Sequence, residues 1–86
     1  MTIRSVAIVG LGLLGGSIGL AVREYLPGVA TTGYDRDPAT RSRSAERGLV
    51  AQVCDNAAEA VREADLVIFC VPVGAMREAA AEVAGA

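Results

Sequence analysis

The sequence predicts an α/β domain in which helices cover both faces of a parallel sheet. Short apolar runs alternate along the 86 residues with segments whose apolar residues recur at helical spacing, giving the pattern βαβαβαβα. A glycine-rich turn joins the first run to the first helical segment, and Asp35 closes the second run. Such alternation favours parallel strands connected by helices.

Local signals define each element in turn. Pro27 and Gly28 end the first helix, and Asp37 before Pro38 is the N-cap of the second, which Gly48 follows as its C-terminal glycine. Asp55 or Asn56 is expected to cap the third helix. The predicted strands are residues 6–9, 29–34, 49–54 and 66–71, and the predicted helices are residues 13–25, 38–47, 57–64 and 73–84.

The apolar run at residues 66–71 suits a central strand better than an edge strand. A doubly wound sheet begins with the strand order 3-2-1-4 and continues beyond strand four. If the chain stops at Ala86, this run lies at an edge without the charge or proline that normally protects one. Residues 1–86 are therefore expected to be the N-terminal part of a truncated doubly wound domain, marginal as a monomer and inclined to associate along this strand.

Composition excludes several classes of function. The eight basic residues are all arginine, they are scattered, and with ten acidic residues the formal charge is −2, so nucleic acid is not an expected partner. The chain has no histidine, which removes the usual imidazole base and the commonest metal ligand, and no metal site is expected. Cys54 and Cys70 fit reduced thiols of a cytoplasmic protein, and neither a signal peptide nor a membrane span is expected.

The turn after the first strand reads GLGLLG, which is the GxGxxG pattern at Gly10, Gly12 and Gly15. The first glycine allows a tight turn, the second lets a pyrophosphate approach the backbone, and the third lets the helix pack closely. The phosphates would meet free N–H groups at the start of the helix. Asp35 is placed to bond the adenosine ribose hydroxyls, so the pattern predicts a Rossmann-type NAD(P)-binding domain. The alternative is a glycine-rich turn that binds nothing.

The choice between NAD and NADP depends on the end of the second strand. The Asp35 carboxylate accepts from ribose hydroxyls and repels a 2′-phosphate, which favours NAD. Arg36 and Arg41 follow, and either is compatible with a 2′-phosphate or with a solvated surface position. Val71 and Pro72, at the carboxyl end of the fourth strand, either line the cofactor's ribose or simply end the strand. The other acidic residues, including Glu78 and Glu82, are interpreted as solvated surface, and Tyr34 as a packing residue.

Longer stretches are more specific than GxGxxG. The strand Val6–Val9 is followed by GLGLLGGSIGLAVRE, and Gly33-Tyr34-Asp35-Arg36, ERGLVAQV, and DLVI before Val71-Pro72-Val73 come later in that order. In these features the chain resembles the first part of the prephenate and arogenate dehydrogenases of tyrosine biosynthesis. The positions that the resemblance implies as cofactor-binding are Gly10, Leu11, Gly12, Leu13, Leu14, Gly15, Asp35, Arg36, Val71 and Pro72.

The resemblance implies an NAD(P)-dependent oxidative decarboxylation of prephenate or arogenate. Hydride passes from the ring carbinol carbon to the nicotinamide, and carbon dioxide leaves as the ring becomes aromatic. In such enzymes a histidine assists at the ring hydroxyl. This histidine lies in later parts of the enzyme, as do the substrate-binding groups and the helical domain that forms a homodimer. No catalytic residue therefore transfers to this chain. We expect the 86 residues alone to be inactive. The alternatives are another NAD(P)-dependent dehydrogenase, or a stand-alone dinucleotide-binding or interaction module without catalysis.

Overall fold

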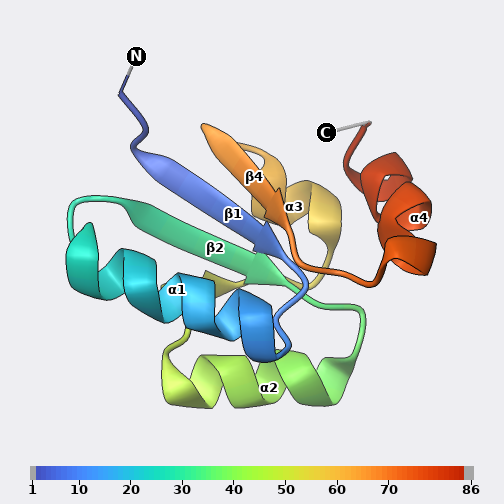
Figure 1. Ribbon diagram of the computed structural model, residues 1–86, viewed down its shortest axis with the longest axis horizontal. Coiled ribbons are helices and arrows are strands. Elements are labelled where there is room, and N and C mark those ends of the chain that lie inside the picture. Colours follow the sequence, from blue (N-terminus) through green and yellow to red (C-terminus); the bar gives the residue numbers. More distant parts are fainter. Residues whose placement is uncertain (1, 85–86) are drawn as a thin grey trace.

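The computed structural model describes residues 2–84. Its elements alternate as the sequence predicts (Figure 1). They are β1 (Ser5–Val9), α1 (Leu13–Tyr25), β2 (Ala30–Tyr34), α2 (Pro38–Arg47), β3 (Gln52–Val53), α3 (Ala57–Val61), β4 (Leu66–Phe69) and α4 (Val73–Ala84).

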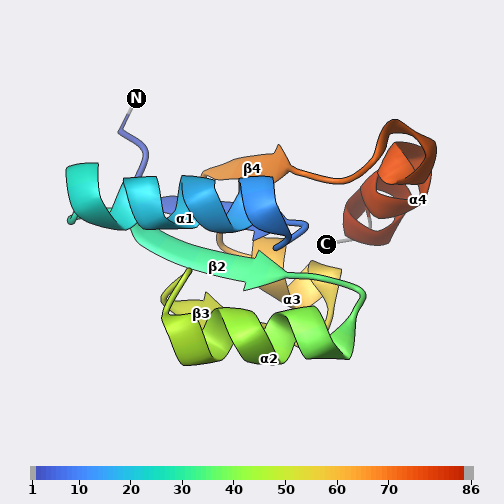
Figure 2. The same cartoon turned by 60° about the horizontal axis from the view of Figure 1, so that its bottom comes forward.

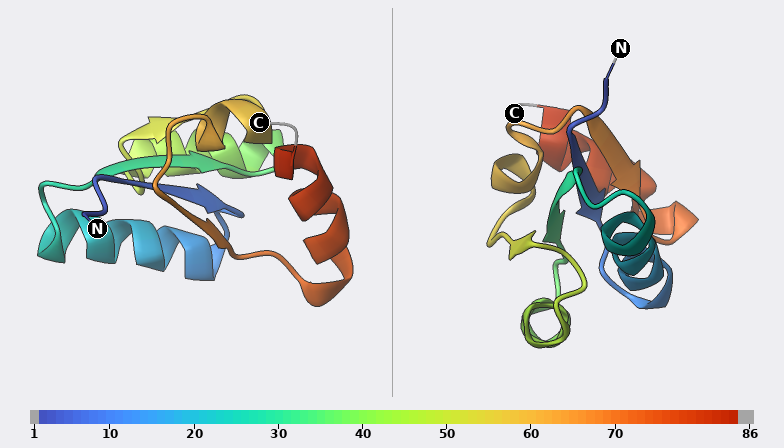
Figure 3. Two further views of the ribbon diagram at one scale, coloured as in Figure 1. Left: turned by 90° about the horizontal axis from the view of Figure 1, so that it is seen from above. Right: turned by 90° about the vertical axis from the view of Figure 1, so that its left-hand side faces the viewer.

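The four strands form one parallel sheet in the order β3-β2-β1-β4, which confirms the predicted start of a doubly wound sheet. β1 is flanked by β2, with Val9 opposite Tyr34, and by β4, with Val9 opposite Phe69. Helices α1 and α3 lie on opposite faces of the sheet (Figures 2 and 3). Helix α4 lies beyond the carboxyl ends of β1 and β4 (Figure 3). The strand order therefore reverses beside β1, at the edge of the sheet that faces α4.

The core forms around β1 because this strand is covered on both faces. Four of its five residues are buried, and Ile8 is fully enclosed. Leu11 and Val50 complete the buried cluster, with Ile68 of β4 packed against it. Fully burying an isoleucine side chain stabilises the fold by about 1.5–3 kcal/mol, so β1 carries a large share of the packing energy.

Two helices begin at the predicted caps. The Asp37 carboxylate accepts from the Ala39 N–H at 3.2 Å and from the Thr40 hydroxyl at 2.9 Å. These bonds, with the Thr40 bond the larger cause, hold the pKa of Asp37 below its usual value. The Asn56 side chain accepts from the Glu59 N–H at 2.7 Å, which identifies Asn56 as the cap of α3. Gly48 ends α2 in the left-handed region with φ of 63°, as predicted.

Four elements are shorter than the sequence predicts, and strand β2 lacks only residue 29 of its predicted range. Strand β3 covers only Gln52–Val53 because Leu49 and Val50 turn toward α1, where Cβ atoms on Gly16 and Gly19 would meet them. Helix α3 ends at Val61, after which Arg62 and Ala64 bond carbonyls three residues back, at Glu59 and Val61. Strand β4 ends at Phe69, although the Cys70 N–H still donates to the Val9 carbonyl at 2.8 Å.

Strand β4 lies at the sheet edge, and none of its four residues is fully buried. Leu66 is 41% exposed, and Val67, Ile68 and Phe69 are only half-buried. Association along this strand stays a prediction. Separately, none of the helices in residues 2–84 has the length and apolar content that crossing a membrane requires.

Candidate nucleotide site

The loop between β1 and α1 is held by both neighbouring strands. The Gly10 N–H donates to the Tyr34 carbonyl at 2.7 Å, which fixes the loop to the end of β2. Gly10 has φ of 104°, a conformation that side chains disfavour, and a Cβ there would overlap the Cys70 carbonyl beyond β4. Glycine at position 10 is therefore required by the fold itself.

Gly15 is required by the fold as well, whereas Gly12 is not. A Cβ on Gly15 would overlap the Gly10 carbonyl and lie 3.3 Å from the Ile8 side chain. At Gly12, φ of −71° and ψ of −157° are accessible to any residue. An added Cβ there would have no heavy atom of residues 2–84 within 4 Å. The space beside Gly12 is open, which is the feature that a backbone approached by a ligand needs.

The N-terminus of α1 differs from those of α2 and α3. Its cap residue is Gly12, which makes no side-chain hydrogen bond, whereas the side chains of Asp37 and Asn56 cap α2 and α3. The first backbone bond runs from the Gly16 N–H to the Gly12 carbonyl at 2.9 Å. The preceding N–H groups at this helix start, with the positive end of the helix dipole, are suited to receive an anion.

Asp35 joins the end of β2 to the glycine-rich loop. Its Oδ2 accepts from the Leu11 N–H at 2.8 Å, and its Oδ1 accepts from the Asp37 N–H at 2.9 Å. A carboxylate offers about four lone-pair positions, so both oxygens can still accept from a diol. Arg41 donates to the Asp35 carbonyl at 2.7 Å and lies over the Tyr34 ring at 5.5 Å.

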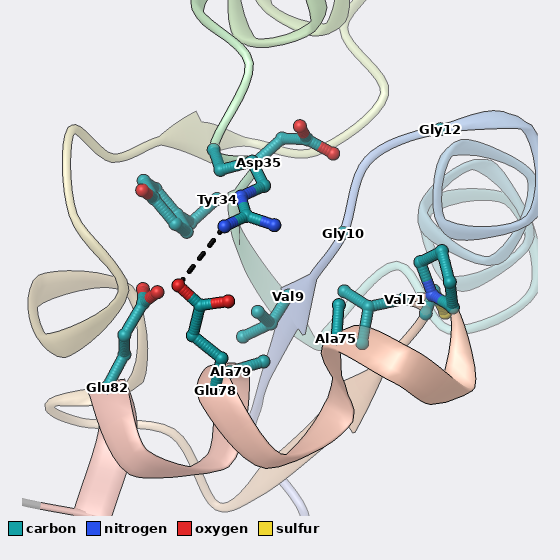
Figure 4. Close-up of a pocket in the computed structure, with 13 residues that line it drawn as sticks. Val9, Gly10, Gly12, Tyr34, Asp35, Val71, Ala75, Glu78, Ala79 and Glu82 are labelled. Atoms are coloured by element: carbon teal, nitrogen blue, oxygen red, sulfur yellow. Dashed lines mark hydrogen bonds and ion pairs between the residues drawn. The ribbon is translucent and has the colours of Figure 1, made fainter.

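These elements surround a cavity of about 310 Å³ at the carboxyl edge of the sheet (Figure 4). That volume is at the lower end of the range for small-molecule and cofactor pockets. In Figure 4, the loop with Gly10 and Gly12 lies across the cavity from α4, which carries Glu78 and Glu82. The lining residues are Val9, Gly10, Gly12, Tyr34, Asp35, Arg36, Cys70, Val71, Pro72, Ala75, Glu78, Ala79 and Glu82.

The structure brings together six of the ten predicted site residues. Those that line the cavity are Gly10, Gly12, Asp35, Arg36, Val71 and Pro72. The other four do not line it. The Leu11 side chain is buried in the core, Gly15 lies beneath the loop, and Leu13 and Leu14 are 93% and 65% exposed. Leu11 and Gly15 can therefore contribute only backbone groups at the helix start, whereas the side chains of Leu13 and Leu14 lie open to solvent outside the cavity.

Sequence reasoning missed the α4 wall and Tyr34. Glu78 and Glu82, interpreted as solvated surface, and Tyr34, interpreted as packing, all line the cavity. A signal was present, since Ala75, Glu78, Ala79 and Glu82 follow the i, i+3, i+4, i+7 spacing of a single helix face. Two small residues on that face leave room for a ligand, and the carboxylates flank it.

One ion pair spans the cavity. Arg36 Nη2 lies 3.2 Å from Glu78 Oε1, and the two side chains are 65% and 63% exposed (Figure 4). With Asp35 and Glu82 also in the lining, three carboxylates and one guanidinium surround the opening. The charge on this side of the cavity is therefore negative, opposite to that of the N–H groups at the start of α1.

The cysteine thiols are protonated packing groups. Burial raises the pKa of Cys54, with neighbouring carboxylates adding to the effect, and burial raises the pKa of Cys70. Both are free thiols, as expected from the sequence. Cys70 lines the cavity as a neutral group, not as an activated nucleophile.

The strand order, the glycine-rich loop at the first β–α turn and the cavity at the carboxyl edge define a Rossmann-type α/β domain. The sequence model of the family described as prephenate dehydrogenase, nucleotide-binding domain, matches residues 18–86. This chain belongs to that family.

Individual relatives of known name support the same family assignment. The chain is similar to a cyclohexadienyl dehydrogenase from Zymomonas mobilis, with 45% identity over 96% of the chain and 28% of the relative. It is 33% identical to a prephenate dehydrogenase from Bacillus subtilis over 80% of the chain and 19% of the relative. A crystal structure of the A. aeolicus prephenate dehydrogenase with hydroxyphenyl propionate and NAD+ matches 99% of the chain and 30% of that protein, with 27% identity and a TM-score of 0.87. The chain thus spans less than a third of the length of these proteins.

Proposed function

We propose that residues 1–86 form the N-terminal, cofactor-binding part of a prephenate or arogenate dehydrogenase, and that the cofactor is NAD+. The observation that carries the proposal is Gly12. Neither backbone conformation nor packing requires glycine there, yet the residue borders the cavity and begins a helix without a side-chain cap. A pyrophosphate approaching the backbone accounts for glycine at this position.

Each part of the cavity has a matching part of the dinucleotide. The backbone N–H groups at the start of α1 are suited to the pyrophosphate, and the free lone pairs of Asp35 are suited to the adenosine ribose hydroxyls. Val71 and Pro72 supply an apolar wall at the end of β4. When bound, the nicotinamide accepts a hydride from the substrate. The chain itself binds and orients, since it holds no histidine and no activated thiol for acid–base work.

The finer parts of the proposal follow from the family. The substrate would be prephenate or arogenate, and the substrate-binding groups and the homodimer interface would belong to parts of the protein beyond these residues. The free thiols of Cys54 and Cys70 are consistent with a cytoplasmic protein.

Gly12→Ala tests the proposal, with Gly28→Ala as its matched control. In both, the added methyl group meets no heavy atom of residues 2–84 within 4 Å, so both variants should fold as the unmodified protein does. Gly12→Ala places the methyl group where the pyrophosphate would lie, and we expect the Kd for NAD+, measured by calorimetric titration, to rise about tenfold or more. Gly28 lies outside the cavity and should leave the Kd unchanged. Equal affinity in the two variants would contradict the proposed site.

A further inference from the structure

The ion pair between Arg36 and Glu78 is placed where cofactor selectivity is decided. Arg36 follows Asp35 directly, at the end of β2, and both line the cavity. In Rossmann-type sites the ribose carrying the 2′ position lies at this strand end, and an arginine nearby is what accommodates a 2′-phosphate. Arg36 is therefore the cation best placed to attract NADP+.

Both arginines near this strand end already have partners within the protein. Arg41 donates to the Asp35 carbonyl and lies over the Tyr34 ring. The Arg36 guanidinium is held by Glu78 of α4, 42 residues further along the chain, and Glu82 lines the same wall one turn later. Because both partners are more than half exposed, the pair contributes little to folding. Stability therefore does not explain why this ion pair lies at the cavity opening.

We propose that Glu78 is a specificity-determining residue, which favours NAD+ over NADP+ by keeping Arg36 from a 2′-phosphate. This inference rests on the proposed function, because it concerns how the same cavity selects its dinucleotide. A 2′-phosphate has to compete with the Glu78 carboxylate for Arg36 and then lie beside both Glu78 and Asp35. The ribose hydroxyls of NAD+ need no cation and leave the pair intact.

The test compares Kd values for NAD+ and NADP+, by calorimetric titration of the full-length gene product, in the unmodified protein and in Glu78→Gln. Neutralising one exposed carboxylate should improve NADP+ binding relative to NAD+ by about three- to tenfold. The matched control is Glu24→Gln, the same change on an exposed residue of α1 outside the cavity, which should shift the ratio less than about twofold.

Two further measurements examine the mechanism. In an Arg36→Ala background, Glu78→Gln should improve NADP+ binding clearly less than it does in the unmodified background, because only the direct repulsion between the Glu78 carboxylate and the 2′-phosphate is then removed. The shift in the single variant should shrink in 0.5 M salt, roughly where the Debye length falls below about 5 Å. If Glu78→Gln still binds NAD+ but leaves the ratio of the two Kd values unchanged, the inference about Glu78 is overturned and the proposed function stands. The same conclusion follows if the Kd ratio shifts equally in the Arg36→Ala background. Failure of the unmodified protein to bind NAD+ would instead refute the proposed function, and the inference with it.

Discussion

The two walls of the cavity are built in different ways. The wall made by β1, the glycine-rich loop and β2 belongs to the core, where Val6–Val9 are almost wholly enclosed and Gly10 is bonded to β2. The opposite wall, made by β4 and α4, has a half-exposed strand and a helix that buries only Ala79 among residues 73–84. Under the proposed function, the first wall would fix the position of the phosphates, while the second would contribute charge and selectivity with little effect on stability.

The largest effect that tests this comparison is expected from alanine substitutions of two paired isoleucines, one in each wall. Ile8→Ala removes a fully enclosed side chain of β1 and should lower the free energy of unfolding by about 2–5 kcal/mol. Ile68→Ala, its partner across the β1–β4 ladder, removes a half-buried side chain and should cost less than half as much. Urea denaturation followed by circular dichroism measures both. Equal losses would show that the β4 wall is as integral to the core as the β1 wall.

The fold was predictable because its signals are local. Alternating apolar runs, Asp37 before Pro38 and Gly48 after the second helix are neighbours in sequence, and each marks a boundary that the structure contains. Strand β3 was predicted too long because Leu49 and Val50 pack against α1 glycines thirty or more residues away. The apolar content of residues 49–50 does not reveal that they pack against a helix instead of pairing with a strand.

The cavity lining was predictable at the glycine-rich loop and at the strand ends, including Val71 and Pro72 after β4, but not on α4. Gly10, Gly12 and Asp35 belong to a pattern with fixed spacing, and they line one cavity, while their role in cofactor binding stays a prediction. Glu78 reaches that cavity because α4 lies beyond the carboxyl edge of the sheet, and its partner Arg36 is 42 residues away. An exposed glutamate on a helix has the same local pattern whether it faces solvent or a ligand.

A middle-sized effect is expected at Gly10, on the fixed wall. Gly10→Ala forces a side chain into φ of 104° and against the Cys70 carbonyl, and we expect a loss of about 2 kcal/mol in unfolding free energy. Gly12→Ala, two residues along the same loop, should change stability by less than about 0.5 kcal/mol because its surroundings are open. The urea midpoints of the two variants provide the measurement. A Gly10→Ala midpoint equal to that of Gly12→Ala would mean that the loop is not held between β2 and β4.

The smallest effect, of opposite sign, is expected at Gly74 in the first turn of α4. Its φ is not in the left-handed region, and a Cβ there would have no atom of the described residues within 4 Å. Alanine should therefore fit without strain and reduce the entropy that the chain loses when the helix forms. We expect a gain of about 0.5 kcal/mol, which corresponds to a rise in Tm of about 2–4 °C for a domain of this size. Scanning calorimetry on Gly74→Ala beside the unmodified chain measures this, with Gly28→Ala as a control for glycine replacement outside a helix. A lower Tm in Gly74→Ala would show that α4 is as tightly constrained as the wall it faces.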